Sequence, residues 1–167
     1  ELPRLKTCFK KPVMANVSGF SVEDYAYTCE KLDQEAQIGW FEVNVSCPNV
    51  HGDGMSFGTC PESAAEVTKA VKAVTTKPVF IKLSPNVTDV VSIAKACEDA
   101  GADGISLINT LLGMRIDLRK RQPLLKNVPG GYSGDAGFPV AVRCVYQVAK
   151  AVKIPVIGMG GISSAEN

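Results

Sequence analysis

The sequence has 167 residues, of which 46% are hydrophobic and 21% are charged, and its formal net charge is +1. This composition is typical of a globular protein with an ample apolar core, and the near-zero charge disfavours binding to nucleic acid. No apolar run approaches the ~20 residues that a membrane-spanning helix needs, and the first residues lack the apolar segment of a signal peptide. We therefore expect a cytoplasmic protein that binds neither nucleic acid nor a membrane.

Short strands and longer helices alternate along the chain. Five runs rich in Val, Ile and Phe predict buried strands, at residues 12–17, 40–46, 78–84, 104–109 and 154–158. Between them, helical periodicity predicts helices over residues 21–37, 59–74, 89–100 and 139–152.

The predicted helices carry start signals. Ser21 begins an S-x-x-D pattern, and Thr59 and Glu62 form a capping box. Pro139 suits a first helical turn. A last capping box, over residues 163–166, predicts the start of one more helix.

Strand–helix alternation predicts a parallel α/β sheet, either an open doubly wound sheet or a (β/α)8 TIM barrel. We favour the barrel, because its strand ends converge on one mouth, and four successive strands carry a polar residue at that end. These residues are Asn16, Asn44, Lys82 and Asn109. A complete barrel has ~250 residues, so 167 residues hold only part of one. We expect a single domain over residues 1–167. It would be an incomplete central portion of about five βα units, truncated at both ends.

Residues 110–133 interrupt the alternation and have no helical periodicity, which is typical of a functional loop over a barrel mouth. This insertion contains a basic run, which is either a solvated loop face or a docking patch for an acidic partner. The run comprises Arg115, Arg119, Lys120 and Arg121.

The cysteines and the single histidine exclude several kinds of site. No two of the six cysteines are closer than 13 positions, and His51 is the only histidine, so zinc and two-histidine sites are not expected. We expect reduced thiols and no metal on this chain. The helical periodicity places three cysteines in the apolar core, namely Cys29, Cys97 and Cys144.

The second strand ends in a polar pattern. Strand alternation places Glu42, Asn44 and Ser46 on one face, where three polar groups require partners. Cys47 then lies where the strand becomes a loop. One interpretation of Cys47 is an accessible thiol that acts as a base or nucleophile. The alternative interpretation is that Cys47 is a small, buried apolar residue of the core.

Lys82 lies within an apolar strand, where a cation needs an anion or a polar cavity. It is a Schiff-base amine, a cationic clamp on an electron-rich ring, or one half of an ion pair with a carboxylate such as Glu42. The amides of Asn44, Asn49 and Asn109 together suit a planar ring with several C=O and N–H groups.

Two glycine-rich segments follow later strands. Residues 157–161 precede a helix start, and such a loop either binds an anion or forms a tight turn. Residues 130–134 end the insertion and would let a cofactor approach the backbone.

Several motifs resemble dihydroorotate dehydrogenases. They occupy residues 44–49, 81–89, 108–115 and 158–162, and residues 121–123 and 130–134 are similar to the class 1B form. The resemblance implies an FMN-containing barrel that oxidises (S)-dihydroorotate to orotate in pyrimidine biosynthesis. It also implies a homodimer and an electron-transfer subunit that carries FAD and a 2Fe-2S cluster and delivers electrons to NAD+.

The resemblance also assigns roles to residues. Cys47 would remove the proton from C5 of the substrate while hydride passes from C6 to FMN. The substrate-binding residues would be Asn44, Asn49, Asn109 and Thr110. FMN would contact Asn16, Asn44, Lys82, Ile108 and Gly134, with its phosphate at Gly160 and Gly161.

Two alternative functions stay open besides dihydroorotate oxidation. They are a dihydropyrimidine dehydrogenase-like flavin enzyme and an aldolase that forms a Schiff base on Lys82.

Overall fold

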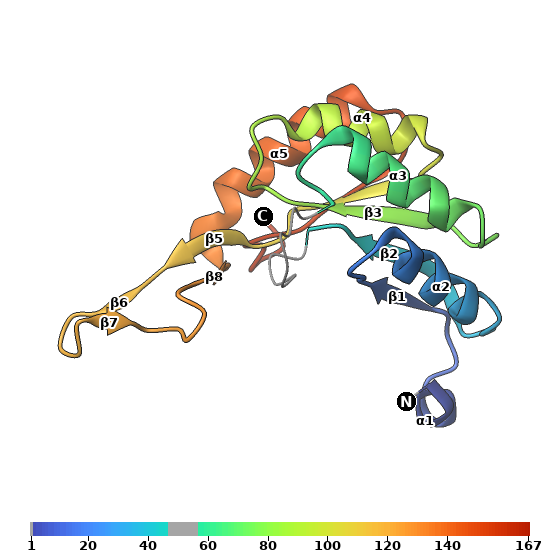
Figure 1. The fold of residues 1–167 in the computed structure, drawn as a ribbon, viewed down its shortest axis with the longest axis horizontal. Helices are drawn as coiled ribbons and strands as arrows, with labels where there is room; N and C mark the ends of the chain where they lie inside the picture. The colour runs from blue at the N-terminus through green and yellow to red at the C-terminus, as the bar shows by residue number, and fades with distance from the viewer. Residues whose placement is uncertain (1, 47–56) are drawn as a thin grey trace.

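The centre of the fold is a parallel sheet of five strands, in a computed structural model that describes residues 2–46 and 57–167 (Figure 1). Its strand order, β1-β2-β3-β4-β9, follows the chain without a reversal. A doubly wound sheet reverses its order at a switch point, so this order confirms the incomplete TIM barrel. The strands are β1 (Val13–Val17), β2 (Ile38–Asn44), β3 (Val79–Leu83), β4 (Gly104–Leu107) and β9 (Val156–Gly158).

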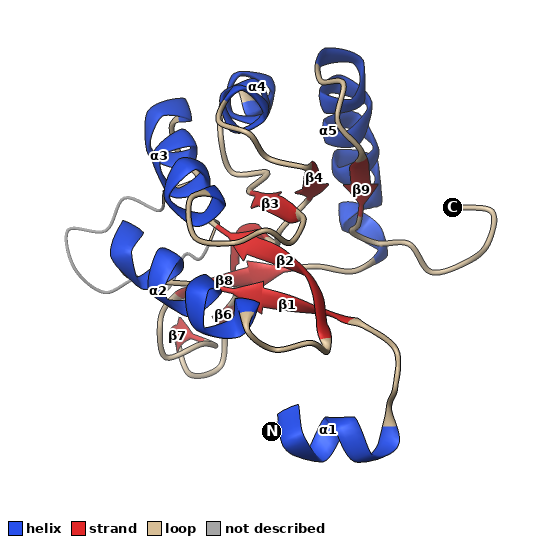
Figure 2. Cartoon of the chain, turned by 90° about the vertical axis from the view of Figure 1, so that its right-hand side faces the viewer, coloured by secondary structure: helices blue, strands red, loops and turns tan. Residues whose placement is uncertain are grey.

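Four helices connect these strands and follow one another along one side of the sheet (Figure 2). They are α2 (Val22–Asp33), α3 (Pro61–Lys72), α4 (Val90–Asp99) and α5 (Phe138–Ala151). The Ser21 hydroxyl accepts a hydrogen bond from the Asp24 amide at 3.1 Å, which confirms the predicted start of α2. Asp89 caps α4 in the same way, by accepting from the Val91 and Ser92 amides.

Two expectations about helix starts are wrong. The residue that caps α3 is Cys60 and not Thr59, because Pro61 has the fixed φ that suits the first helical turn. Residues 163–166 do not form a helix. Here the Ser164 hydroxyl donates to the Asn167 side chain at 2.6 Å, a local hydrogen bond that competes with a helical turn.

The apolar core lies between the sheet and the helices. Alternation along β3 buries Val79, Ile81 and Leu83 toward the helices, and Val43 of β2 is buried in the same way. The three cysteines expected in this core, Cys29, Cys97 and Cys144, are all buried. Burial raises the pKa of the Cys29 thiol to about 12 and that of Cys97 to about 11, so both stay protonated.

The insertion forms a projecting arm of antiparallel strands, which the sequence did not predict (Figure 1). In this arm β5 (Leu111–Met114) pairs with β8 (Pro129–Tyr132), and β6 (Ile116–Asp117) pairs with β7 (Gln122–Pro123). The Asp117 side chain closes the turn by accepting from the Arg119 and Lys120 amides. The four residues of the basic run are all exposed.

The N-terminal segment adds a short helix, α1 (Leu2–Cys8), which the sequence also did not predict. It buries no residue, and an ion pair of 2.6 Å joins its Lys6 to Glu35. No helix in the described ranges is both long and apolar enough to cross a membrane.

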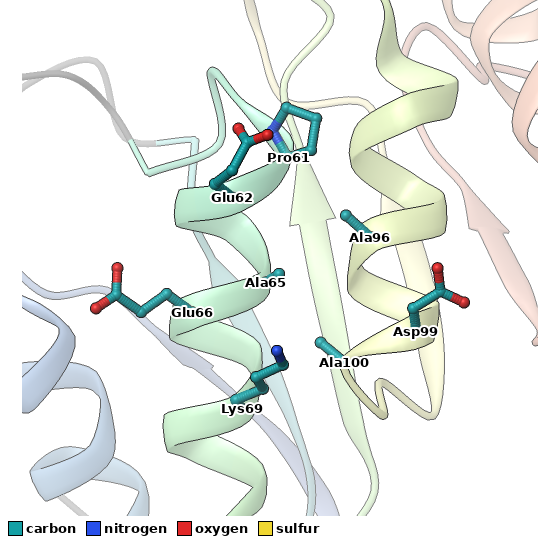
Figure 3. Close-up of a pocket in the computed structure, with 8 residues that line it drawn as sticks. All are labelled: Pro61, Glu62, Ala65, Glu66, Lys69, Ala96, Asp99 and Ala100. Carbon is teal, nitrogen blue, oxygen red and sulfur yellow. The ribbon is translucent and has the colours of Figure 1, made fainter.

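A groove of about 510 Å³ lies between α3 and α4 on the helical side of the molecule (Figure 3). Small and charged side chains line it, and the predicted site residues that the structure describes lie elsewhere. The lining residues are Pro61, Glu62, Ala65, Glu66, Lys69, Ala96, Asp99 and Ala100.

The central strand provides a test of this packing. Ile81 is fully buried, so Ile81→Ala should lower the free energy of unfolding by about 2–5 kcal/mol, through lost burial and the cavity left behind. Urea denaturation of the full-length protein measures this loss. The exposed Lys95→Ala is the control and should stay within about 0.5 kcal/mol of wild type. An equal loss in both variants would contradict this account of the core.

Candidate active site

Polar side chains gather where the parallel strands end, an edge of the sheet that we call the rim. The register pairs Asn16 with Glu42 and Asn44 with Lys82, so residues from β1, β2 and β3 lie side by side. Lys82 also faces Ser106 of β4. The predicted convergence of strand ends therefore exists among the described strands.

Glu42 connects two of the predicted site residues. Its Oε2 atom accepts a hydrogen bond from Asn16 Nδ2 at 2.6 Å and contacts Lys82 Nζ at 3.3 Å. The Glu42 side chain is 3% exposed and that of Lys82 is 19% exposed, so this is a largely buried ion pair. Of the three interpretations of Lys82, the structure shows the ion pair, which uses one of its three N–H groups.

The amides of Asn44 and Asn109 form a second unit. Asn109 Nδ2 donates to Asn44 Oδ1 at 3.0 Å. Two backbone amides fix both orientations: Ser46 N donates to Asn44 Oδ1 at 3.1 Å, and Thr110 N donates to Asn109 Oδ1 at 2.8 Å. Because Asn44 Oδ1 accepts two hydrogen bonds, Asn44 offers a ligand its N–H donors.

The backbone beneath Asn44 is held firmly. The Tyr25 hydroxyl donates to the Asn44 carbonyl at 2.9 Å, and Ser46 Oγ donates to the Lys82 carbonyl at 2.7 Å. Tyr25 is 1% exposed, so this contact joins the buried face of α2 to the end of β2. The rim amide therefore sits on a rigid support.

Six predicted residues line one small cavity of about 60 Å³. They are Ile108, Asn109, Thr110, Gly134, Gly160 and Gly161. At Gly161 the backbone has φ +72°, and an added Cβ would lie 2.8 Å from the Gly134 carbonyl oxygen. Both glycine-rich segments thus meet at a point where only glycine fits.

The structure leaves some predicted residues untested and adds others. Cys47 and Asn49 lie outside the described residues. Asn86, which sequence reasoning missed, donates from Nδ2 to the Thr110 carbonyl and accepts from the Leu112 amide, both at 2.9 Å. The sequence feature that could have indicated Asn86 is its place directly after the Ser-Pro pair that follows β3. Ser106 was also missed, although a serine within an apolar strand is such a signal, and its fully buried hydroxyl has no partner within residues 2–46 and 57–167.

The order of the sheet and the polar rim define a portion of a (β/α) barrel whose candidate active site lies at the carboxyl ends of its strands. The family model for dihydroorotate dehydrogenase matches residues 1–167, and the chain belongs to this family.

Curated relatives carry two different names. The chain is 54% identical to the dihydroorotate dehydrogenase B (NAD(+)) catalytic subunit of Shouchella clausii, covering 100% of this chain and 55% of that protein. The same subunit of Geobacillus kaustophilus is 52% identical, with coverage of 100% and 53%. Dihydroorotate dehydrogenase A (fumarate) of Lacticaseibacillus paracasei is 54% identical, with coverage of 100% and 58%. The chain thus spans about half the length of the relatives it matches.

The contacts of Asn86 predict that it anchors the base of the arm. Asn86→Ala removes the acceptor of the Leu112 amide, so hydrogen exchange at Leu112 should become about five-fold faster, the equivalent of about 1 kcal/mol. Exchange at Ile81 in β3 should not change. Thr88→Ala, an exposed change in the same loop, is the control. Unchanged exchange at Leu112 would contradict the anchoring role.

Proposed function

We propose that the full-length protein oxidises (S)-dihydroorotate to orotate in pyrimidine biosynthesis, with FMN as the hydride acceptor. The observation that carries this proposal is the gathering of the family's motif residues, drawn from separate βα units, at one rim. We infer the reaction from membership of the family, and we infer how the ligands are recognised from the contacts of the described residues.

The substrate is a dihydropyrimidine ring with carbonyl groups, N–H groups and a carboxylate, and its product, orotate, has the planar ring that the amides were predicted to suit. Asn44 offers N–H donors, which suit the carbonyl and carboxylate oxygens, and Thr110 has a hydroxyl that both donates and accepts. Asn109 stiffens this arrangement, because its two amide ends are held by Asn44 and the Thr110 amide. Asn49 is proposed as a fourth contact on the resemblance alone.

The residues present fit an FMN group. Lys82 supplies a cation for the electron-rich edge of a flavin, and Gly160 and Gly161, which both have positive φ, belong to a glycine-rich loop of the kind whose backbone N–H groups bind a phosphate. FMN, when bound, supplies the hydride acceptor. The residues that would hold it are Asn16, Asn44, Lys82, Ile108, Gly134, Gly160 and Gly161.

The remaining task is to remove a proton from C5, which we assign to Cys47. In the sequence Cys47 comes three residues after the last residue of β2 and directly before Pro48, whose ring fixes its own φ. The rigid support under Asn44, three residues earlier, constrains where this loop begins. The proposed base thus lies three residues after Asn44 in the chain, whereas Asn109 follows β4.

We propose that the electrons leave through a partner subunit with FAD and a 2Fe-2S cluster to NAD+, and that the catalytic chain is a homodimer. The B-type names of two relatives support this acceptor, whereas the relative named for fumarate supports a second candidate. Turnover of the purified catalytic subunit with fumarate as sole acceptor decides between them. Fast turnover would favour the fumarate type.

The two alternatives have direct tests. An aldolase needs a free, neutral amine at Lys82, whereas the structure pairs this amine with a buried carboxylate. Borohydride trapping of a substrate adduct on Lys82 would support the aldolase. Faster oxidation of dihydrouracil than of dihydroorotate would support a dihydropyrimidine dehydrogenase-like enzyme.

Replacing the proposed base tests the reaction. Cys47→Ala should lower turnover of dihydroorotate by about 10²–10⁴-fold, because a general base is lost, while the flavin spectrum stays unchanged. The control is Cys60→Ala, at a partly buried thiol beside Ser63 that caps α3, which should keep wild-type turnover. Full activity of Cys47→Ala would refute the assignment.

The polarity of Asn44 gives a second test. Asn44→Asp keeps the oxygen that accepts from Ser46 and Asn109 but removes both N–H donors, so KM for dihydroorotate should rise by about 10–100-fold. The exposed Asn127→Asp adds the same charge in the arm and should leave KM unchanged. An unchanged KM in Asn44→Asp would show that Asn44 does not donate to the substrate.

A further inference from the structure

Glu42 is a buried carboxylate for which the proposed reaction has no direct use. It is 3% exposed and lies on β2 opposite Asn16, two residues before Asn44. Its Oε2 atom contacts both Asn16 Nδ2 and Lys82 Nζ, at 2.6 and 3.3 Å. Its Oε1 atom is buried without a hydrogen-bond partner among residues 2–46 and 57–167.

A carboxylate in this place is costly for a purely structural purpose. Burying a charge requires compensation, and a well-packed apolar residue often stabilises a fold as well as or better than a buried ion pair does. Its neighbours on the strand, Phe41 and Val43, are buried on the opposite face, so they do not compensate its charge. The two groups that Glu42 holds are both residues proposed to contact FMN.

We propose that Glu42 is a positioning residue that sets the orientation and the effective charge of the flavin-binding groups on β1 and β3. This inference rests on the proposed function, because it concerns FMN. Glu42 fixes Asn16 with its N–H toward the carboxylate, which leaves the Asn16 carbonyl oxygen as the acceptor for a ligand. It also balances the charge of Lys82, so the pair has no net charge where Lys82 alone would have +1.

The charge balance has a consequence for the flavin. A cation beside a flavin stabilises the negative charge of the reduced form and raises its reduction potential. By neutralising part of the Lys82 charge, Glu42 keeps this potential lower than the lysine alone would set it. A lower potential favours passing electrons onward to an acceptor.

The test is the midpoint potential of FMN in the full-length enzyme, titrated against reference dyes. Glu42→Gln keeps the shape of the side chain and removes its charge, so the potential should shift to a more positive value. Glu42→Asp keeps the charge and should return the potential toward that of wild type. Glu66→Gln, the same change at an exposed carboxylate of α3 on the helical side, should leave the potential unchanged (Figure 3).

A second comparison separates positioning from a general effect on the fold. In a Lys82→Met background the Glu42→Gln change should shift the potential much less, because a buried carboxylate that has lost its cation takes up a proton, and replacing a neutral acid with an amide changes no charge. This comparison also carries the test if the single Glu42→Gln variant fails to fold. A shift in the double variant as large as a full charge effect would show that Glu42 acts without Lys82 and would overturn the proposal.

The outcomes also distinguish this inference from the proposed function. A wild-type enzyme that oxidises dihydroorotate, with a potential that does not respond to Glu42→Gln, overturns the role of Glu42 alone. A loss of stability in Glu42→Gln without a change in potential does the same, since it shows a purely structural role. A wild-type enzyme that binds no FMN overturns both.

Discussion

The register of β2 against β3 is the constraint on which the candidate site depends. It places Asn44 beside Lys82, and because side chains alternate along a strand it also turns Val43 into the core and Glu42 toward the rim residues. A slip of one residue would exchange these faces and put a carboxylate among the apolar side chains under the helices. The buried Phe41 and Val43 of β2 oppose such a slip, since both would leave the core. Hydrophobic burial on one face thus fixes the polar geometry on the other.

Only some of the polar side chains at the rim have all their buried atoms hydrogen-bonded within the described residues. Asn16, Lys82, Asn44 and Asn109 all have partners, whereas Glu42 Oε1 and Ser106 Oγ have none among the described residues. Buried polar atoms without partners are rare in folded proteins and usually mark a place that something else completes. Both atoms belong to the inner strands β2 and β4, beside the lysine that we assign to the flavin. These two atoms therefore lie beside the predicted cofactor residue Lys82, whereas a third buried atom without a partner among the described residues, Gln37 Oε1, lies directly before β2.

Sequence reasoning predicted the parts of this protein that local physics controls. The five strands were found within about two residues because β-branched runs bounded by Gly, Pro or Asn have few other solutions. The cap at Ser21 was found because capping involves neighbours in the chain. The predicted cap at Thr59 was wrong because two local signals competed, the capping box of Thr59 and Glu62 and the proline at position 61. The proline determined where α3 begins.

Partners that lie far apart in the sequence were beyond that reasoning. Lys82 and Glu42 are 40 positions apart, so the sequence offered their ion pair only as one of three interpretations. Asn86 and Thr110 are 24 positions apart, and a lone asparagine in a loop does not indicate what it will bind. The strands of the arm were missed because β5 and β8 lack a clear alternation of apolar and polar residues and pair across a long loop. The glycines at 134 and 161 were recognised as loop residues, but their contact with each other required coordinates.

The contacts also divide the rim by polarity. On the side of β1 and β3, a carboxylate orients Asn16 and holds a cation, so this side offers one acceptor and a partly balanced positive charge. Around Asn44 and Asn109, backbone amides occupy both amide oxygens, so Asn44 offers donors. Neither orientation depends on a ligand, because acceptor-only carboxylates and donor-only backbone amides admit a single arrangement of each side chain. A rim prepared in this way loses little conformational freedom on binding, and the fold itself therefore supplies part of the selectivity that we assign to the enzyme.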